Sequence, residues 1–220
     1  QITIEGFEEE EDPFIGNALV DMYVKCGLLD EAQNVFDDLS IQDVVSWTAL
    51  IAGYAEQGEN EKAMICHRQM QEQCLLPNDV TFASTLKACG NKADQENGAR
   101  LHAQVLAMGH LGNLDVITAT ALIDMYAKCG SLEDADHIFR KTPNQNVVSW
   151  SAITTEHGSQ VGQTMMFSHL LLQMQSNGVV PDVVTFVCIL KACSGRGAFY
   201  EGKQVHALYV ESVSETDMNT

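Results

Sequence analysis

The chain has 220 residues, of which 45% are hydrophobic and 19% charged, a composition typical of a folded protein rather than a disordered one. Its 12 basic and 30 acidic side chains give a formal net charge of −18, a poor match to the basic surface of most nucleic-acid-binding proteins. Seven cysteines without a C-x-x-C pair argue against a disulfide framework, and no apolar run reaches the roughly 18 residues of a membrane span.

The chain begins with an acidic segment, residues 1–12, which we expect to be solvated. After it, the sequence of residues 18–36, ALVDMYVKCGLLDEAQNVF, returns as residues 121–139, ALIDMYAKCGSLEDADHIF, with 11 of 19 positions identical. VVSW recurs at the same offset of 103, and VTF, LKAC and HA recur at an offset of 104. Self-similarity at a fixed period indicates a stacked repeat protein that presents a long surface.

The period divides into three units of unequal length, each long enough for two helices and two turns. In chain order, we predict six units at residues 13–43, 44–78, 79–115, 116–146, 147–182 and 183–217, followed by 218–220 as a tail or the start of another unit. The sequence begins and ends in mid-pattern, so we expect a segment of a longer array.

The fourth unit shows the expected helix pair most clearly. Apolar residues on one helical face run from Ala121 to Cys129, Gly130 suits the turn, and a second apolar face follows. Ser131 with Asp134 three residues later predicts a capping box for the second helix. VVSW and VTF are rich in valine, but their place within the period predicts first turns of helices rather than strands. Two glycines in the fifth unit predict a distorted helix at 154–163.

The segments ALIDMYAKCGSLEDA, VVSWTALIAGYAEQG, MQSNGVVPDVVTF and LKAC closely resemble the pentatricopeptide repeat (PPR) family of land plants. The resemblance covers residues 13–217, and the alternating unit lengths look like the PLS subclass of that family. The tetratricopeptide repeat, with its constant 34 residues, fits these lengths badly. The resemblance implies an all-α fold, a right-handed α-solenoid of stacked helix-turn-helix repeats. It also implies binding of single-stranded RNA, about one nucleotide per unit.

By this resemblance, the fifth and last residues of a unit form a base-reading pair. The predicted pairs are Asn17 with Asp43, Thr48 with Asn78, Thr120 with Asn146, and Ser151 with Asp182. The resemblance implies U for Asn–Asp, A for Thr–Asn and G for Ser–Asp, which gives the footprint 5′-U-A-n-A-G-n-3′. By the same resemblance, the third unit of each period, 79–115 and 183–217, is the long unit. These long units carry Ala83 with Asp115 and Val187 with Asp217, to which we assign no base. The plainer alternative is that these are only helix-terminal polar residues.

Two further sets of positions follow from the same resemblance. The second residue of each unit is expected to flank a base: Phe14, Val45, Val80, Ile117, Val148 and Val184. Lys25 and Lys128, near the ends of first helices, match places where a basic side chain approaches phosphate.

The remaining candidates for chemistry favour structural roles. Trp47 and Trp150 could stack on bases, but their helical spacing favours the core. Cysteines at apolar positions predict packing rather than a metal site, and His67 stands where the family usually has a core aromatic. The zinc deaminase signature H-x-E…C-x-x-C is absent from the sequence, as are the Walker A, G-x-S-x-G and H-E-x-x-H motifs. We therefore expect no catalytic residues, no metal and no cofactor.

The resemblance thus implies a sequence-specific single-stranded RNA-binding array, and the missing motifs predict that this chain is not itself an enzyme. The resemblance implies organelle RNA processing or C-to-U editing, in mitochondrion or chloroplast, through a domain or protein partner outside this chain. Neither a membrane nor a small-molecule substrate is expected. The alternative is a protein–protein interaction scaffold with an acidic surface, which the charge of −18 favours. The RNA hypothesis requires the reading pairs to share one groove.

Overall fold

The computed structural model describes residues 13–108, 115–142, 149–150, 171, 174, 176, 178–196 and 198–217. Regular structure in these residues is helical throughout, without a strand, so the predicted all-α class is confirmed. The segments VVSW at 44–47 and VTF at 80–82 lie in first turns of helices, as predicted. The predicted distortion at 154–163 lies outside the described residues. The chain divides into two compact parts, one ending at Ala121 and the other beginning at Leu122.

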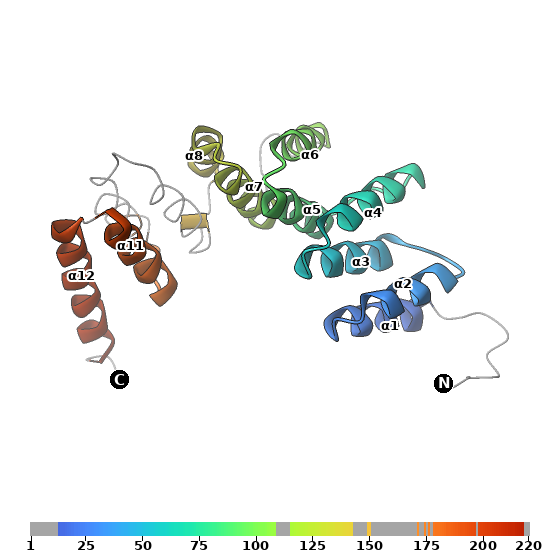
Figure 1. Cartoon of the computed structure of the whole chain (residues 1–220), viewed down its shortest axis with the longest axis horizontal. Coiled ribbons are helices and arrows are strands. Elements are labelled where there is room, and N and C mark those ends of the chain that lie inside the picture. Colours follow the sequence, from blue (N-terminus) through green and yellow to red (C-terminus); the bar gives the residue numbers. More distant parts are fainter. Residues whose placement is uncertain are drawn as a thin grey trace. The chain divides into compact units, whose positions relative to one another are not determined.

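The helices follow one another in pairs, which fall inside the predicted units (Figure 1). In the first three units they are α1 Pro13–Lys25, α2 Leu29–Asp38, α3 Val44–Glu56, α4 Asn60–Glu72, α5 Asp79–Lys92 and α6 Gln95–Ala107. The later described helices are α7 Val116–Lys128, α8 Leu132–Lys141, α11 Val183–Arg196 and α12 Phe199–Asp217.

In the first part of the chain, the first helices contact helices of their own and of neighbouring units, and α3 and α5 also pack on the second helix of the preceding unit, α2 and α4. They pack on the second helix of their own unit, as α1 does on α2 and α3 on α4, and on the first helix of the next unit, as α1 does on α3 and α3 on α5 (Figure 1). This is the packing of stacked helix-turn-helix repeats, the arrangement expected of an α-solenoid. It brings the last residue of one unit beside the first helices of two units.

The turn inside each of the units 13–43, 44–78 and 116–146 depends on a glycine in the left-handed conformation. Gly27, Gly58 and Gly130 have φ of +75°, +80° and +79°. After Gly27 the amide of Leu28 donates to the carbonyl of Tyr23 at 3.0 Å, which closes the end of α1. A side chain at positive φ is unfavourable, so the matched glycines of the repeat are explained by backbone geometry.

The capping boxes are found at first helices and not where the sequence analysis put one. Ser131 makes no side-chain cap hydrogen bond within the described residues, so the predicted box with Asp134 is wrong. Its ψ of 66° follows the glycine turn directly and is far from the extended value that a capping side chain needs. Asp43 and Asn78, with ψ of 178°, are extended and do cap α3 and α5.

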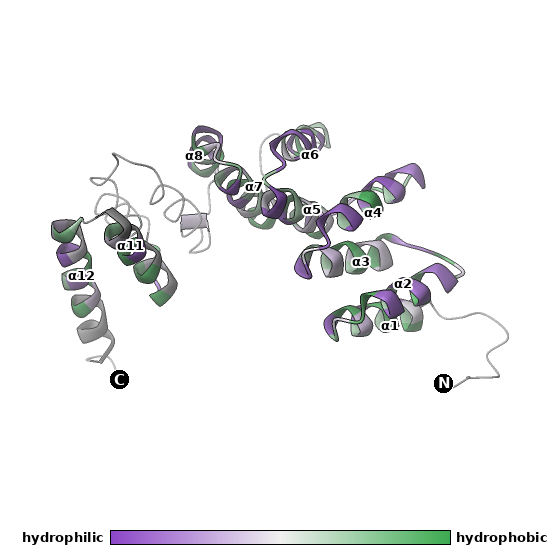
Figure 2. Ribbon diagram, viewed as in Figure 1, coloured by the Kyte–Doolittle hydropathy of each residue, from purple (hydrophilic) through white to green (hydrophobic). Residues whose placement is uncertain are grey.

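The core of the first part lies between the helix pairs. It includes Val20 and Val24 of α1, Phe36 of α2, and Trp47 and Leu50 of α3. Each described helix carries hydrophobic and hydrophilic residues, as an amphipathic helix does (Figure 2). Trp47 and Trp150 are only 4% and 1% exposed, which confirms the predicted core role over base stacking.

Candidate nucleic-acid interface

The first predicted reading pair forms a direct contact. The Asn17 side-chain amide donates to both carboxylate oxygens of Asp43, at 3.1 and 3.2 Å, from α1 to the residue before α3. Asp43 also accepts from the backbone amides of Val45 and Ser46, both at 2.9 Å, as the N-cap of α3. The fifth and last residues of the first unit therefore meet at the junction between two units.

These hydrogen bonds set the charge state of Asp43. Burial raises the pKa of its carboxyl, but hydrogen bonds from Ser46, Asn17 and Val45 more than offset this, and the pKa lies below its ordinary value of 3.8. Asp43 is therefore a carboxylate at neutral pH. It can only accept hydrogen bonds from a ligand.

The second predicted pair is connected through a third residue. The Thr48 hydroxyl lies 2.7 Å from the Thr81 hydroxyl, and the Thr81 hydroxyl donates to Asn78 Oδ1 at 3.0 Å. Thr48 is 9% exposed, whereas Asn78 is exposed. A ligand can thus reach Asn78 directly, while Thr48 supports it from below.

The remaining pairs are only partly described. Thr120 is half-buried on α7, and Asn146 and Ser151 lie outside the described residues. Asp182 is exposed and caps α11, where its Oδ1 accepts from the Thr185 amide and hydroxyl, both at 2.8 Å. The residues predicted to pair with Thr120 and Asp182 therefore lie outside the described part of the chain.

The last residues of these units are also polar residues at helix ends, as the plainer alternative to base reading holds. Asp43, Asn78 and Asp182 all accept hydrogen bonds from the first turn of the following helix. Capping leaves part of each side chain exposed or half-buried, so it orients these groups without hiding them. The sequence signal that was missed is the serine or threonine three positions later.

The predicted base-flanking residues that the structure describes are exposed. The exposed fractions are 81% for Phe14, 59% for Val45, 48% for Val80 and 52% for Ile117. The side chains of Val148 and Val184 lie outside what the structure describes. An apolar side chain that recurs at one place in the unit and remains exposed offers a surface on which a planar base can pack.

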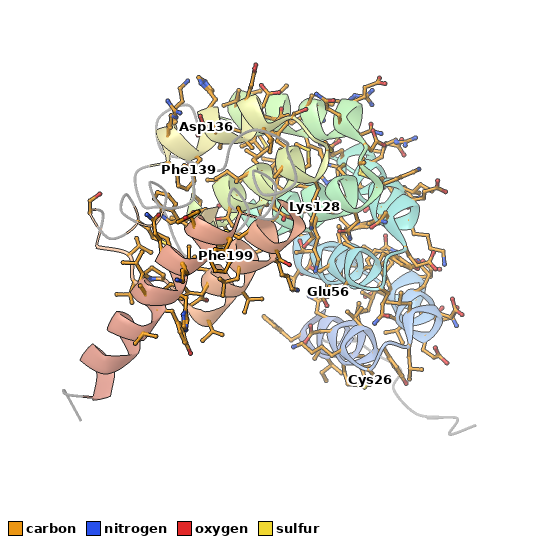
Figure 3. The ribbon with its side chains drawn as sticks, turned by 60° about the vertical axis from the view of Figure 1, so that its left-hand side comes forward. Cys26, Glu56, Lys128, Asp136, Phe139 and Phe199 are labelled. Atoms are coloured by element: carbon orange, nitrogen blue, oxygen red, sulfur yellow. The ribbon has the colours of Figure 1, made fainter. Side chains whose placement is uncertain are left out.

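The predicted phosphate-contacting lysines each hold an acidic partner. Lys25 contacts Asp21 and Lys128 contacts Asp124, both at 2.7 Å and one helical turn apart. The hydrogen bond and the charge of Asp21 raise the pKa of Lys25. Lys128 lies on the last turn of α7, and the matching place on α3 holds Glu56 (Figure 3). Each of these lysines is thus already paired with a carboxylate of its own helix, which reduces the positive charge that it can present to a phosphate.

Two exposed lysines were not among the predicted phosphate-contacting residues although they recur at one position of the repeat. Lys87 and Lys191 stand at the ninth position of the third and sixth units, inside the repeated motif LKAC, and both are exposed. The repetition of LKAC was the signal in the sequence that could have identified them.

Within the described ranges, no group of three or more His, Cys, Asp or Glu side chains could hold a metal ion. Nor is any described helix long and apolar enough to span a bilayer.

Comparison with known proteins matches this repeat pattern. The PPR repeat model matches residues 17–41 and 117–146, and the model of the PPR repeat family matches residues 42–91. Two pentatricopeptide repeat-containing proteins of Arabidopsis thaliana are 43% and 41% identical, over 90% and 88% of this chain. The chain spans about a quarter of those relatives, 26% and 23% of their lengths.

Solved structures show the same fold at lower identity. The pentatricopeptide repeat protein PPR10, in complex with an 18-nt psaJ RNA element, has a TM-score of 0.73 at 17% identity, covering 87% of this chain and 29% of that one. PPR10 from maize, in another structure, has a TM-score of 0.64 at 19% identity, over 91% of this chain and 30% of that one. Helix pairs, glycine turns, sequence matches and fold agree, and the chain belongs to the pentatricopeptide repeat family.

Proposed function

We propose that this chain binds single-stranded RNA and reads bases through the fifth and last residues of its units. The observation that carries the proposal is the repeated meeting of these residues at unit junctions. Asn17 contacts Asp43 directly, and Thr48 connects with Asn78 through one hydroxyl. The PPR10 structure solved with an RNA element shows that a relative of the same fold holds RNA.

The chemistry of the two described pairs agrees with the bases that the resemblance implies. The Asp43 carboxylate can accept a hydrogen bond from N3–H of uracil, which adenine and cytosine lack at their ring nitrogens. The Asn78 amide has an NH₂ group that can donate to N1 of adenine. The footprint hypothesis is therefore 5′-U-A-n-A-G-n-3′, with the amino end of the chain toward the 5′ end.

The role of such binding would be organelle RNA processing or C-to-U editing, with the chemistry carried out by another domain or a partner. Two Arabidopsis relatives, 36% and 34% identical over 94% and 90% of this chain, bear the names mitochondrial and chloroplastic. Their names support a mitochondrial or chloroplast location for this chain. This chain would recognise the RNA sequence at which that chemistry occurs, and we assign it no catalytic residue.

The competing function is an acidic scaffold that binds a basic protein. The formal charge of −18 and the ion-paired lysines favour it, because phosphate is repelled by an acidic surface. The exposed Asn78 and the exposed apolar second residues favour RNA, since a scaffold has no need of them at fixed positions.

A binding assay at several stated salt concentrations tests the proposal. Fluorescence anisotropy would compare a strand that contains 5′-UANAGN-3′ with scrambled strands of equal length and composition. We expect tighter binding of the matched strand at every salt concentration. Equal affinity for all strands would reject the base assignment. Failure to bind any strand, together with salt-sensitive binding of a basic protein, would favour the scaffold.

A further inference from the structure

The third residue of every unit after the first is a serine or threonine, and it is not a member of any predicted reading pair. All five are buried, with exposed fractions of 0% or 1%: Ser46, Thr81, Thr118, Ser149 and Thr185. A buried hydroxyl is costly unless it is hydrogen-bonded, so its partners reveal what it does.

The Thr81 hydroxyl has no hydrogen-bonding capacity left over. It donates to Asn78 Oδ1 at 3.0 Å, receives the backbone amide of Asn78 at 3.2 Å and lies 2.7 Å from the Thr48 hydroxyl. A carboxamide oxygen cannot donate, so the single Thr81 proton is committed to Asn78. The proton between the two threonine hydroxyls must therefore come from Thr48, which makes Thr81 the acceptor of that hydrogen bond.

This arrangement fixes which end of the Asn78 amide faces outward. Oδ1 accepts from both the backbone amide of Thr81, at 2.9 Å, and its hydroxyl, at 3.0 Å. A flipped amide would set its NH₂ group against the Thr81 backbone N–H, donor against donor. Nδ2 therefore points away from the helix, and it has no hydrogen-bond partner among the described residues. The exposed end of Asn78 is a donor.

We propose that Thr81 is the positioning residue of the second reading pair, because it holds the Asn78 amide with its donor toward the RNA. The inference rests on the proposed function. An outward donor matches a base whose ring nitrogen on the Watson–Crick edge is unprotonated, as in adenine and cytosine. Guanine and uracil present N–H at that place and are disfavoured. Thr48 then acts on the base through Thr81 rather than by touching it.

The contacts of this hydroxyl differ from one unit junction to the next. Thr185 donates to Asp182 Oδ1 at 2.8 Å, the same contact as that between Thr81 and Asn78. Thr118 instead donates to Asp79 at 3.0 Å, at the junction after the third unit, whose last residue is Asp115. That unit is the long one whose residue pair has no assigned base. At the first junction the Ser46 hydroxyl donates to the Asp43 backbone carbonyl at 3.0 Å, so the hydroxyl holds the side chain of the last residue at Asn78 and Asp182 but not at Asp43.

Three variants of the whole chain test the role of Thr81. Thr81→Val removes the hydroxyl and keeps the shape, and Thr81→Ser keeps the hydroxyl. Thr85→Val is the matched control, since Thr85 is also fully buried on α5, where its hydroxyl bonds the Thr81 carbonyl at 2.7 Å and His67 at 3.1 Å. Each would be titrated with 5′-UANAGN-3′ strands carrying A or G at the second nucleotide, and U or C at the first.

Thr81→Val should reduce the preference for A over G at the second nucleotide roughly three- to tenfold, the effect of one hydrogen bond. The preference for U over C at the first nucleotide should not change, which shows that the variant is folded and binds. Thr81→Ser and Thr85→Val should both keep the preference for A. An unchanged preference in Thr81→Val, or an equal loss in Thr85→Val, would overturn the positioning role while RNA binding stands. A wild-type chain without base preference would overturn the proposed function as well.

Discussion

Phe36 and Trp47 meet edge to face, with their ring centroids 4.5 Å apart and their planes at 69°. Phe36 belongs to the second helix of one unit and Trp47 to the first helix of the next. In the second part of the chain, Phe139 and Trp150 form the same contact, with centroids 4.5 Å apart at 81°. The aromatic pair therefore joins unit 13–43 to unit 44–78, and its counterpart joins unit 116–146 to unit 147–182.

Trp47→Ala should destabilise the chain by about 3–5 kcal/mol, because it leaves a cavity in the core beside Phe36. The indole N–H also donates to Gln73 at 3.2 Å, and that bond is lost too. Chemical denaturation followed by circular dichroism measures the change. Trp47→Phe is the control and should retain most of the stability. A loss below about 1 kcal/mol in Trp47→Ala would show that the junction does not depend on this ring.

Gly53→Ala should destabilise the chain by about 1–3 kcal/mol through overpacking. An added Cβ would lie 2.7 and 2.8 Å from the two methyl carbons of Val24, at the place where α1 packs on α3. Thermal unfolding checks the effect. The double variant Gly53→Ala with Val24→Ala should recover part of the loss if steric overlap is the cause, and a further loss would contradict it.

Stability should fall as the pH is lowered from 7.5 toward 5, in part because of His67. Burial lowers the pKa of His67 below its ordinary value of 6.5, partly offset by the Gln104 side chain, so the folded chain holds this ring neutral. The unfolded chain then binds the proton more readily, and the contribution of His67 is lost as the pH falls from 6.5 through the lower folded pKa.

Comparison of variants isolates this contribution from the other titrating groups. The free energy of unfolding would be measured by denaturant titration at each pH. His67→Gln should flatten its dependence on pH, whereas His137→Gln, which alters an exposed side chain, should leave it as in the wild type. Equal slopes in the wild type and His67→Gln would show that His67 is not responsible.

Asn78→Asp should shift the preference at the second nucleotide from A toward G by roughly tenfold or more. A carboxylate that caps α5 would present an acceptor where the amide presents a donor. Asp182 already adopts this arrangement, with Oδ1 held by Thr185. Competition binding with strands that differ only at this nucleotide measures the shift. Asn91→Asp adds the same charge at an exposed place on α5 and should not alter base preference.

Lys128→Gln should weaken binding to all RNA strands alike and reduce the slope of log affinity against log salt by about 1. Lys62→Gln, a variant with the same charge change on the second helix α4, is the control. Asp124→Asn, which frees Lys128 from its ion pair, should strengthen binding. Equal slopes for the two lysine variants would show that Lys128 is remote from the phosphates.

Local pattern in the sequence was sufficient to predict the helix pairs that the structure describes and the glycine turns within them. Glycines at matched places predicted the turns because only glycine adopts positive φ without strain, and Gly27, Gly58 and Gly130 confirm this. The cap at Ser131 was wrong because cap geometry depends on the backbone that precedes the helix. At that position the backbone is leaving a glycine turn.

The site was less predictable than the fold because its contacts cross unit boundaries. The sequence paired Thr48 with Asn78 but gave no sign that Thr81 lies between them. It placed lysines near phosphate without their acidic partners one turn earlier. In both cases the missing information is which side chains meet in space.

The cap at a described junction such as Asn78 has a consequence for anyone who transplants these repeats. Asn78 closes one unit in the sequence, yet its side chain is held by the first turn of the next helix. A graft cut after Asn78 would separate its side-chain amide, which we propose contacts a base, from the Thr81 hydroxyl that orients it. A cut placed between α4 and Asn78 would move both together, so the natural cassette for engineering a new specificity begins a few residues earlier than the repeat in the sequence does.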